Sequence, residues 1–192
     1  MQFIQRIPLL LFDPDYATSD LYDSPRLGEA FFMVSTYAVL TSFNSFFSGY
    51  LKTDTVSVGL IAFLGSALLI YLTWVFLAAV FHIASEVLGG LGEFPHALGF
   101  VGLAAAPHIL TSFASIILTI LSIEVFYDDP ELILPKIGLG LSLLAMAWGW
   151  PGVLCYFGMK NAERVHPLKA LVVTLLVFFA FAALEVFTSD AL

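Results

Sequence analysis

The sequence predicts an all-α polytopic membrane protein, a bundle of five transmembrane helices. Of its 192 residues, 60% are hydrophobic and 11% are charged, whereas a soluble domain is about half apolar and about a quarter charged. Five apolar segments each reach the length of about 20 residues that a helix needs to cross a hydrocarbon core of roughly 30 Å. Strands of a membrane barrel would alternate strictly in hydrophobicity, which these segments do not.

A polar N-terminal segment, residues 1–29, precedes the first span and is expected in the cytoplasm, and residues 30–192 are expected to form the transmembrane domain. Five apolar residues near the start would share one face of a short helix, which suits a segment at the membrane interface. The alternative is a loosely ordered tail. The shared face would consist of Phe3, Ile4, Ile7, Leu10 and Leu11.

The five predicted spans are Ala30–Leu51, Ser57–Val80, Leu98–Leu121, Leu132–Phe157 and Leu168–Phe187. The second helix is expected to continue to Leu88, because no helix breaker interrupts it, so its last two turns reach the membrane interface. The third is expected to kink at Pro107, which removes a backbone hydrogen bond near mid-membrane. His108 would then be a partner for the freed carbonyl, because lipid offers none.

Basic residues near the ends of the spans predict the orientation. Five of the seven lie on the side of the N-terminus, which is therefore predicted to be cytoplasmic, with the C-terminus outside. The first set is Arg6, Arg26, Lys160, Arg164 and Lys169, and the second is Lys52 and Lys136. The formal net charge of −8 argues against nucleic acid as a partner.

His82 and Glu86 are four residues apart and so face the same way on a helix. They suit a proton relay, a partner-binding surface, or half of a metal site with His96 or His108. The structural alternative is a pair that anchors the helix end. No metal-binding motif such as HExxH occurs, so we expect no metal and no cofactor.

The stretch after the second span is a glycine-rich hinge with Gly89, Gly90 and Gly92. Because the hinge makes the second and third spans antiparallel neighbours, we expect these two to form the centre of the bundle. We expect His108 to point into that bundle. An ionisable group inside a membrane is a functional hypothesis by default, and the alternative is a neutral imidazole that satisfies the proline kink.

Three short motifs stand out: Asp20-Leu21-Tyr22 before the first span, the hinge from Gly89 to Phe94, and Gly102 followed by Pro107 in the third span. Together they resemble motifs of the Yip domain family, the Ypt/Rab-interacting polytopic membrane proteins. Two positions depart from the family pattern. Asp23-Ser24 stands where the family has a glycine, and Leu103 stands where it has a tyrosine.

This resemblance implies five spans and, in eukaryotic members, association with Rab-type GTPases and with one another in vesicle traffic. Those members carry a long cytosolic N-terminal region that is not seen here. The chain is more similar to compact prokaryotic members, so Rab binding is not carried over. The cytoplasmic membrane of a prokaryote is the expected location.

Two functional hypotheses follow, and an intramembrane enzyme is a distant third because no catalytic motif occurs. The first is a non-enzymatic membrane adaptor or organiser that presents residues 1–29 and the hinge to a cytosolic protein or to another copy. The alternative is a small channel or carrier for protons, ions, lipids or small solutes, with His82, Glu86 and His108 along its route. A polar cavity that reaches His108 would favour the carrier, and a tightly packed bundle would favour the adaptor.

Overall fold

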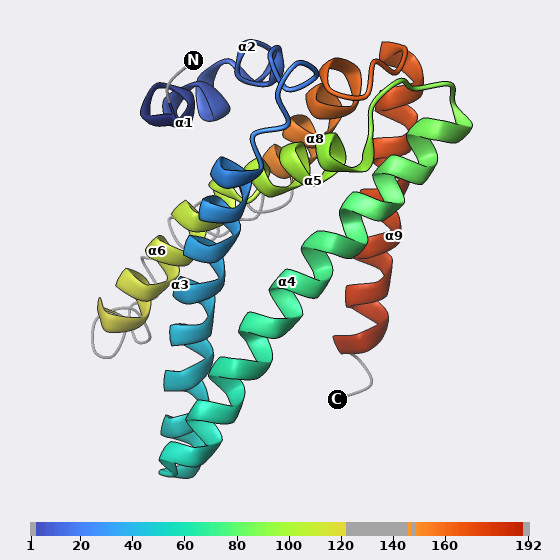
Figure 1. Cartoon of the computed structure of the whole chain (residues 1–192). Helices are drawn as coiled ribbons and strands as arrows, with labels where there is room; N and C mark the ends of the chain where they lie inside the picture. Colours follow the sequence, from blue (N-terminus) through green and yellow to red (C-terminus); the bar gives the residue numbers. More distant parts are fainter. Residues whose placement is uncertain (1–2, 122–145, 147–148, 190–192) are drawn as a thin grey trace, which may run out of the picture.

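The computed structural model of the chain describes residues 3–121, 146 and 149–189, and within these ranges regular structure is helical without strands. Figure 1 shows long helices running away from a layer of shorter ones. The helices are α1 (Phe3–Phe12), α2 (Pro14–Thr18), α3 (Leu27–Thr53), α4 (Val56–Val87), α5 (Phe94–Leu103), α6 (Ala106–Leu121), α8 (Trp150–Asn161) and α9 (Pro167–Ser189).

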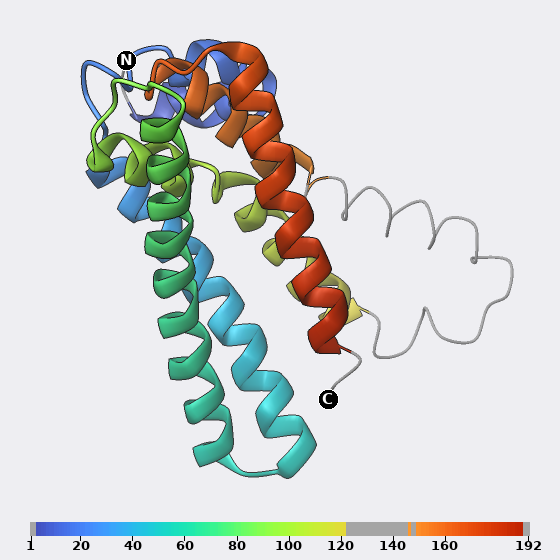
Figure 2. The same cartoon turned by 90° about the vertical axis from the view of Figure 1, so that its right-hand side faces the viewer.

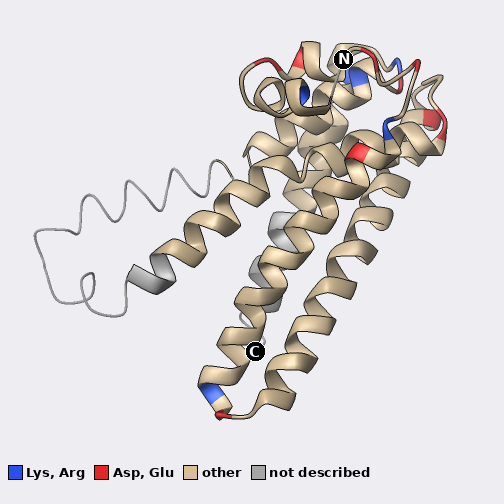
Figure 3. Cartoon of the chain, turned by 60° about the vertical axis from the view of Figure 1, so that its left-hand side comes forward, with Lys and Arg blue, Asp and Glu red and all other residues tan. Residues whose placement is uncertain are grey.

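Three stretches are long and apolar enough to cross a membrane: α3, α4 and the pair α5–α6 over Phe94–Ile117. Charged residues gather at the two ends of these helices and leave the middle uncharged (Figure 3). The prediction of an all-helical membrane protein is therefore confirmed. Most of the predicted fourth span, Leu132–Phe157, lies outside the described residues, and α8 contains its end. In the fifth, the described apolar stretch is Pro167–Ala180.

Helix α4 has 32 residues, which corresponds to roughly 48 Å. It ends at Val87, so the predicted continuation of this helix almost to Leu88 is confirmed. The N–H of Leu88 still bonds to the carbonyl of Ala84, and Gly89 follows with φ +82°. A glycine in the left-handed region just after the last turn is a common way to end a helix.

The third span is not one kinked helix, and the expected kink at Pro107 is wrong. It consists of α5 and α6, separated at Ala104 and Ala105. Pro107 lies in the first turn of α6, where its missing N–H would have had no intrahelical partner. The ring of His108 does not complete a kink either, and instead stacks on Tyr37 of α3 with centroids 5.0 Å apart.

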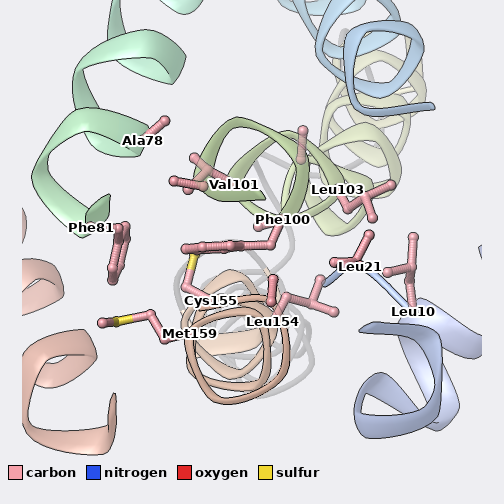
Figure 4. Packing of buried hydrophobic residues seen from close by; sticks show 14 of the residues in the cluster. Leu10, Leu21, Ala78, Phe81, Phe100, Val101, Leu103, Leu154, Cys155 and Met159 are labelled. Carbon is pink, nitrogen blue, oxygen red and sulfur yellow. The ribbon is translucent and has the colours of Figure 1, made fainter. Parts of the chain in front are cut away.

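Buried apolar residues cluster where α1, α2, α5, α8 and the end of α4 meet (Figure 4). Phe81 and Phe100 meet edge to face with centroids 5.6 Å apart. Gly158 of α8 lies so close to Phe100 that a Cβ there would be 2.3 Å from its ring. Because α5 is surrounded, it occupies the centre, as expected for the third span.

The expectation that the second span shares this centre is wrong. No residue in the most apolar window of α4 is buried within the structure. Helix α4 pairs with α3 and exposes large aliphatic side chains elsewhere, including Leu64, Leu68 and Leu72. These faces suit lipid, so α4 lies at the periphery and joins the core through its last turns, at Ala78 and Phe81.

The N-terminal segment folds back over the end of the bundle that carries α8 (Figure 2). Leu10 and Leu21 are completely buried, and the indole N–H of Trp150 donates to the carbonyl of Leu10 at 2.9 Å. The predicted short helix is present, but Ile4 of its predicted face is 78% exposed. Leu10, which also belongs to the predicted face, is buried together with Arg6.

Candidate functional site

Asp20, the first residue of the N-terminal motif, is held by a buried arginine. Arg6 of α1 is completely buried and donates to both carboxylate oxygens of Asp20 at 2.8 Å. Its Nε lies 2.8 Å from Glu29 of α3, and Arg26 also donates to Asp20, at 3.1 Å. Burial opposes the charge of Asp20, but the two arginines outweigh it and lower the pKa of this carboxyl. The motif thus joins α1 to the start of α3.

Leu21 and Tyr22 complete the attachment. Leu21 is completely buried. The ring of Tyr22 stacks on His96 of α5 with centroids 5.7 Å apart, and the guanidinium carbon of Arg164 lies 4.4 Å from its centroid. His96 Nε2 also bonds to the carbonyl of Tyr22 at 2.9 Å. These side chains are therefore engaged within the chain.

The glycines of the hinge are explained by close backbone contact. A Cβ on Gly90 would lie 2.0 Å from the hydroxyl of Ser85, and a Cβ on Gly92 would lie 2.4 Å from Glu163 Oε2. No carbon can approach so closely. The N–H of Leu91 donates to the backbone carbonyl of Glu163 at 2.8 Å. The hinge backbone therefore lies directly on the turn between α8 and α9.

Glu163, which sequence reasoning missed, is the buried centre of this contact. The hydroxyl of Ser85 donates to its Oε2 at 2.9 Å, and His82 Nδ1 lies 3.7 Å from its Oε1. Burial raises the pKa of Glu163, and Ser85 and the histidines His82 and His96 only partly oppose that rise. A single acidic residue in a short polar connection is normally exposed to solvent, so nothing in the sequence marked Glu163 as buried.

His82 and Glu86 do share a face of α4, with His82 Nε2 3.6 Å from Glu86 Oε1. His82 is therefore placed between a buried and an exposed carboxylate. The metal hypothesis does not hold in the described ranges, where no group of three or more His, Cys, Asp or Glu residues could hold an ion. His96 is occupied by the backbone N–H of Glu93, and His108 lies elsewhere.

Gly102 and His108 border the space between the spans. A Cβ on Gly102 would lie 2.6 Å from that of Ala30, so this glycine allows α5 to touch α3. A cavity of about 410 Å³ is lined by His108 and by residues of α3, α4, α8 and α9, most of them apolar. The ring of His108 thus faces neighbouring helices, as expected.

A second cavity of about 320 Å³ shares Tyr37, Thr41 and His108 with the first, and is lined by polar residues of α3 and α6. Thr41 and Ser112 lie 3.2 Å apart through their hydroxyls. Its lining is completed by Asn44, Thr111, Ser112 and Ser115.

The structure does not bring His108 together with His82 and Glu86. Leu77 and Cys155 line the larger cavity, and Phe81 and Met159 come one turn later on the same two helices. Glu163 follows beyond them. Phe81 and Met159 are completely buried, so an apolar layer lies between His108 and the His82–Glu163 pair.

Comparison with known proteins agrees with the motifs. The sequence model of the Yip1 domain matches residues 9–187. Comparisons with curated proteins and with solved structures gave no match. Since the matched range covers most of the chain, and since its helices suit a bilayer, this chain is a membrane protein that belongs to the Yip1 domain family.

Proposed function

We propose that the chain is a non-enzymatic integral membrane adaptor or organiser with five spans, which offers the layer around α1, α2, α5 and α8 to a partner. The observation that carries this proposal is that the layer is a packed body, with its own apolar core and a buried ion-pair network. A packed surface binds without the ordering cost of a loose tail.

The layer is proposed to face the cytoplasm of a prokaryote, with the C-terminus outside. Arg6 and Arg26 pair with Asp20 in this layer, Lys160 pairs with Asp15, and Arg164 lies over Tyr22. Lys52 lies in the last turn of α3, at its opposite end, and Figure 3 shows charged residues at both ends of the long helices. This distribution supports the positive-inside orientation. Lys136 lies outside the described residues.

The proposed contact surface differs from the motif itself, because Asp20, Leu21 and Tyr22 are engaged internally. Exposed large side chains are found instead on α1 and α2 and beside the hinge: Phe12 at 85%, Tyr16 at 57%, Val87 at 80% and Leu91 at 69%. Large patches of exposed apolar side chains mark surfaces for protein or membrane contact. The proposed partner is a cytosolic protein or a second copy of the chain.

Photo-cross-linking in intact membranes tests this surface. A photoreactive residue at Phe12 or Leu91 is expected to give one discrete protein adduct, either with a second copy or with another protein. The matched control is Leu68, which is 61% exposed in the middle of α4 and should react with lipid. Lipid adducts alone at all three positions would refute the adaptor.

The second candidate, a small channel or carrier, is favoured by one observation, the pair of cavities that share His108, of which the smaller has a polar lining. The apolar layer of Phe81 and Met159 would have to move to open a route toward the hinge. Flux of protons, common cations and a fluorescent lipid into liposomes tests it, with His108→Ala and with Ala105→Phe, which would fill the larger cavity. Flux that equals that of empty liposomes would exclude this candidate.

A further inference from the structure

The carboxyl of Glu163 is buried with little compensating charge. Its side chain is completely buried, and Ser85 supplies a neutral hydroxyl. Among the described basic residues, His82 is the one within ion-pair distance of this carboxyl. Glu163 Oε1 and His82 Nδ1 face each other, and neither has a hydrogen-bond partner among the described contacts.

The other charged groups around this site are engaged elsewhere. Glu86 of α4 is 66% exposed on the far side of His82. The Glu93 carboxylate accepts from the backbone N–H of His96, and the His96 ring accepts from the backbone N–H of Glu93. Arg164 lies over the ring of Tyr22, and Lys169 donates to the carbonyl of Leu88. His96 favours the carboxylate through its charge only from a distance. The pair must therefore balance its own charge.

We propose that Glu163 and His82 together retain one proton, and that this proton fastens the hinge at Gly90–Gly92 to the turn between α8 and α9. With one proton the pair is neutral overall, as a carboxylic acid beside imidazole or as a carboxylate beside imidazolium. Without it, a carboxylate is left in a buried site with no cation, which a low dielectric strongly disfavours.

The hinge is the element that this change would move. Gly92 lies directly over Glu163 Oε2, so water reaches the carboxylate when the hinge lifts. Lifting breaks two backbone bonds, from Gly90 N–H to Ser85 and from Leu91 N–H to Glu163. Because burial raises the pKa of Glu163 above its ordinary value, the closed state binds the proton more tightly, and closure is lost as pH rises.

At lower pH this latch, the contact between the hinge at Gly90–Gly92 and the turn between α8 and α9, should remain closed. A protonated Glu163 can still accept the hydrogen bond from the hydroxyl of Ser85. The surface offered by the hinge, which includes Leu91, would thus be ordered at mildly acidic pH and released at higher pH. This inference does not rest on the adaptor function, because its test needs no partner.

Amide hydrogen exchange of the full chain in lipid nanodiscs tests the latch, read at Gly90 and Leu91 from about pH 5 to about pH 8, the range in which histidine changes charge. After correction for the intrinsic exchange rate, protection in the wild type should fall by up to about tenfold per pH unit above the pH at which the pair loses its proton. Glu163→Gln cannot lose a proton and keeps an acceptor for Ser85, so its protection should not depend on pH. The matched control Asp23→Asn, which removes an exposed carboxylate of the same layer away from this pair, should keep the wild-type profile.

Three further results decide whether the proposal stands. Ser85→Ala removes a bond to the carboxylate, so the midpoint should move to higher pH, and a shift to lower pH would overturn the proposal. A flat wild-type profile would also overturn it, and that measurement needs no variant to fold. A slope that survives in Glu163→Gln, or vanishes in Asp23→Asn, would do the same.

Discussion

Replacing Arg6 by methionine should destabilise the chain far more than the same change at Arg26. The guanidinium of Arg6 is completely buried and serves Asp20 and Glu29 together. Removing one partner of a buried ion pair costs about 3–5 kcal/mol, because the other charge is left unpaired. Arg26 meets the same two carboxylates at 3.1 and 3.8 Å but is 30% exposed, so its loss should cost about 1 kcal/mol or less.

Thermal unfolding in detergent can be followed with a thiol-reactive dye, because Cys155 is the chain's sole cysteine and is buried. For a chain of this size, about 1 kcal/mol corresponds to about 2–4 °C in Tm. Arg6→Met should therefore lower Tm by roughly 6–20 °C, and Arg26→Met by no more than about 4 °C. Equal shifts for the two variants would show that burial does not set the strength of this network.

Three more changes test the packed end of the molecule. Gly92→Ala places a carbon against Glu163 and should cost about 1–3 kcal/mol, whereas Gly65→Ala, where the added carbon meets nothing, should not lower Tm. The pKa of Asp20 is lowered because the two arginines outweigh burial. Its ion pairs therefore stabilise the fold at neutral pH, and this stabilisation is lost as pH falls. Asp20→Asn should weaken the decrease of Tm at acidic pH. Tyr22→Ala removes two ring contacts and should lower Tm by several degrees, and a smaller effect than that of an exposed Tyr16→Ala would contradict its role.

The long helices could be predicted because their signal is local. A run of apolar residues without a breaker is enough to define α3 and α4, and the end of α4 near Leu88 followed from the glycines alone. The interruption of the third span was placed at Pro107, but the helix breaks at Ala104 and Ala105. A proline can start a helix as well as kink one, and the sequence does not distinguish these roles.

Only part of the candidate site could be predicted from the sequence, because its remaining residues come from distant parts of the chain. His82 and Glu86 were found through their spacing, whereas Glu163 reaches Ser85 across a separation of 78 residues. The motif Asp20-Leu21-Tyr22 was recognised by resemblance, but its partner Arg6 was counted only as a positive charge. Tertiary contacts decide which charges are buried, and a single sequence does not encode those contacts in its spacing.

The attachment of the first helices to α8 has a consequence for biogenesis. Leu10 bonds to Trp150 across 140 residues, and Asp15 pairs with Lys160 across 145. Contacts so distant in sequence form late, since the loop between them must be closed first. During synthesis, α1 and α2 therefore lack their packing partner until α8 has been synthesised. Until then, the face of α1 that is buried in the folded chain is accessible to a chaperone or to the insertion machinery.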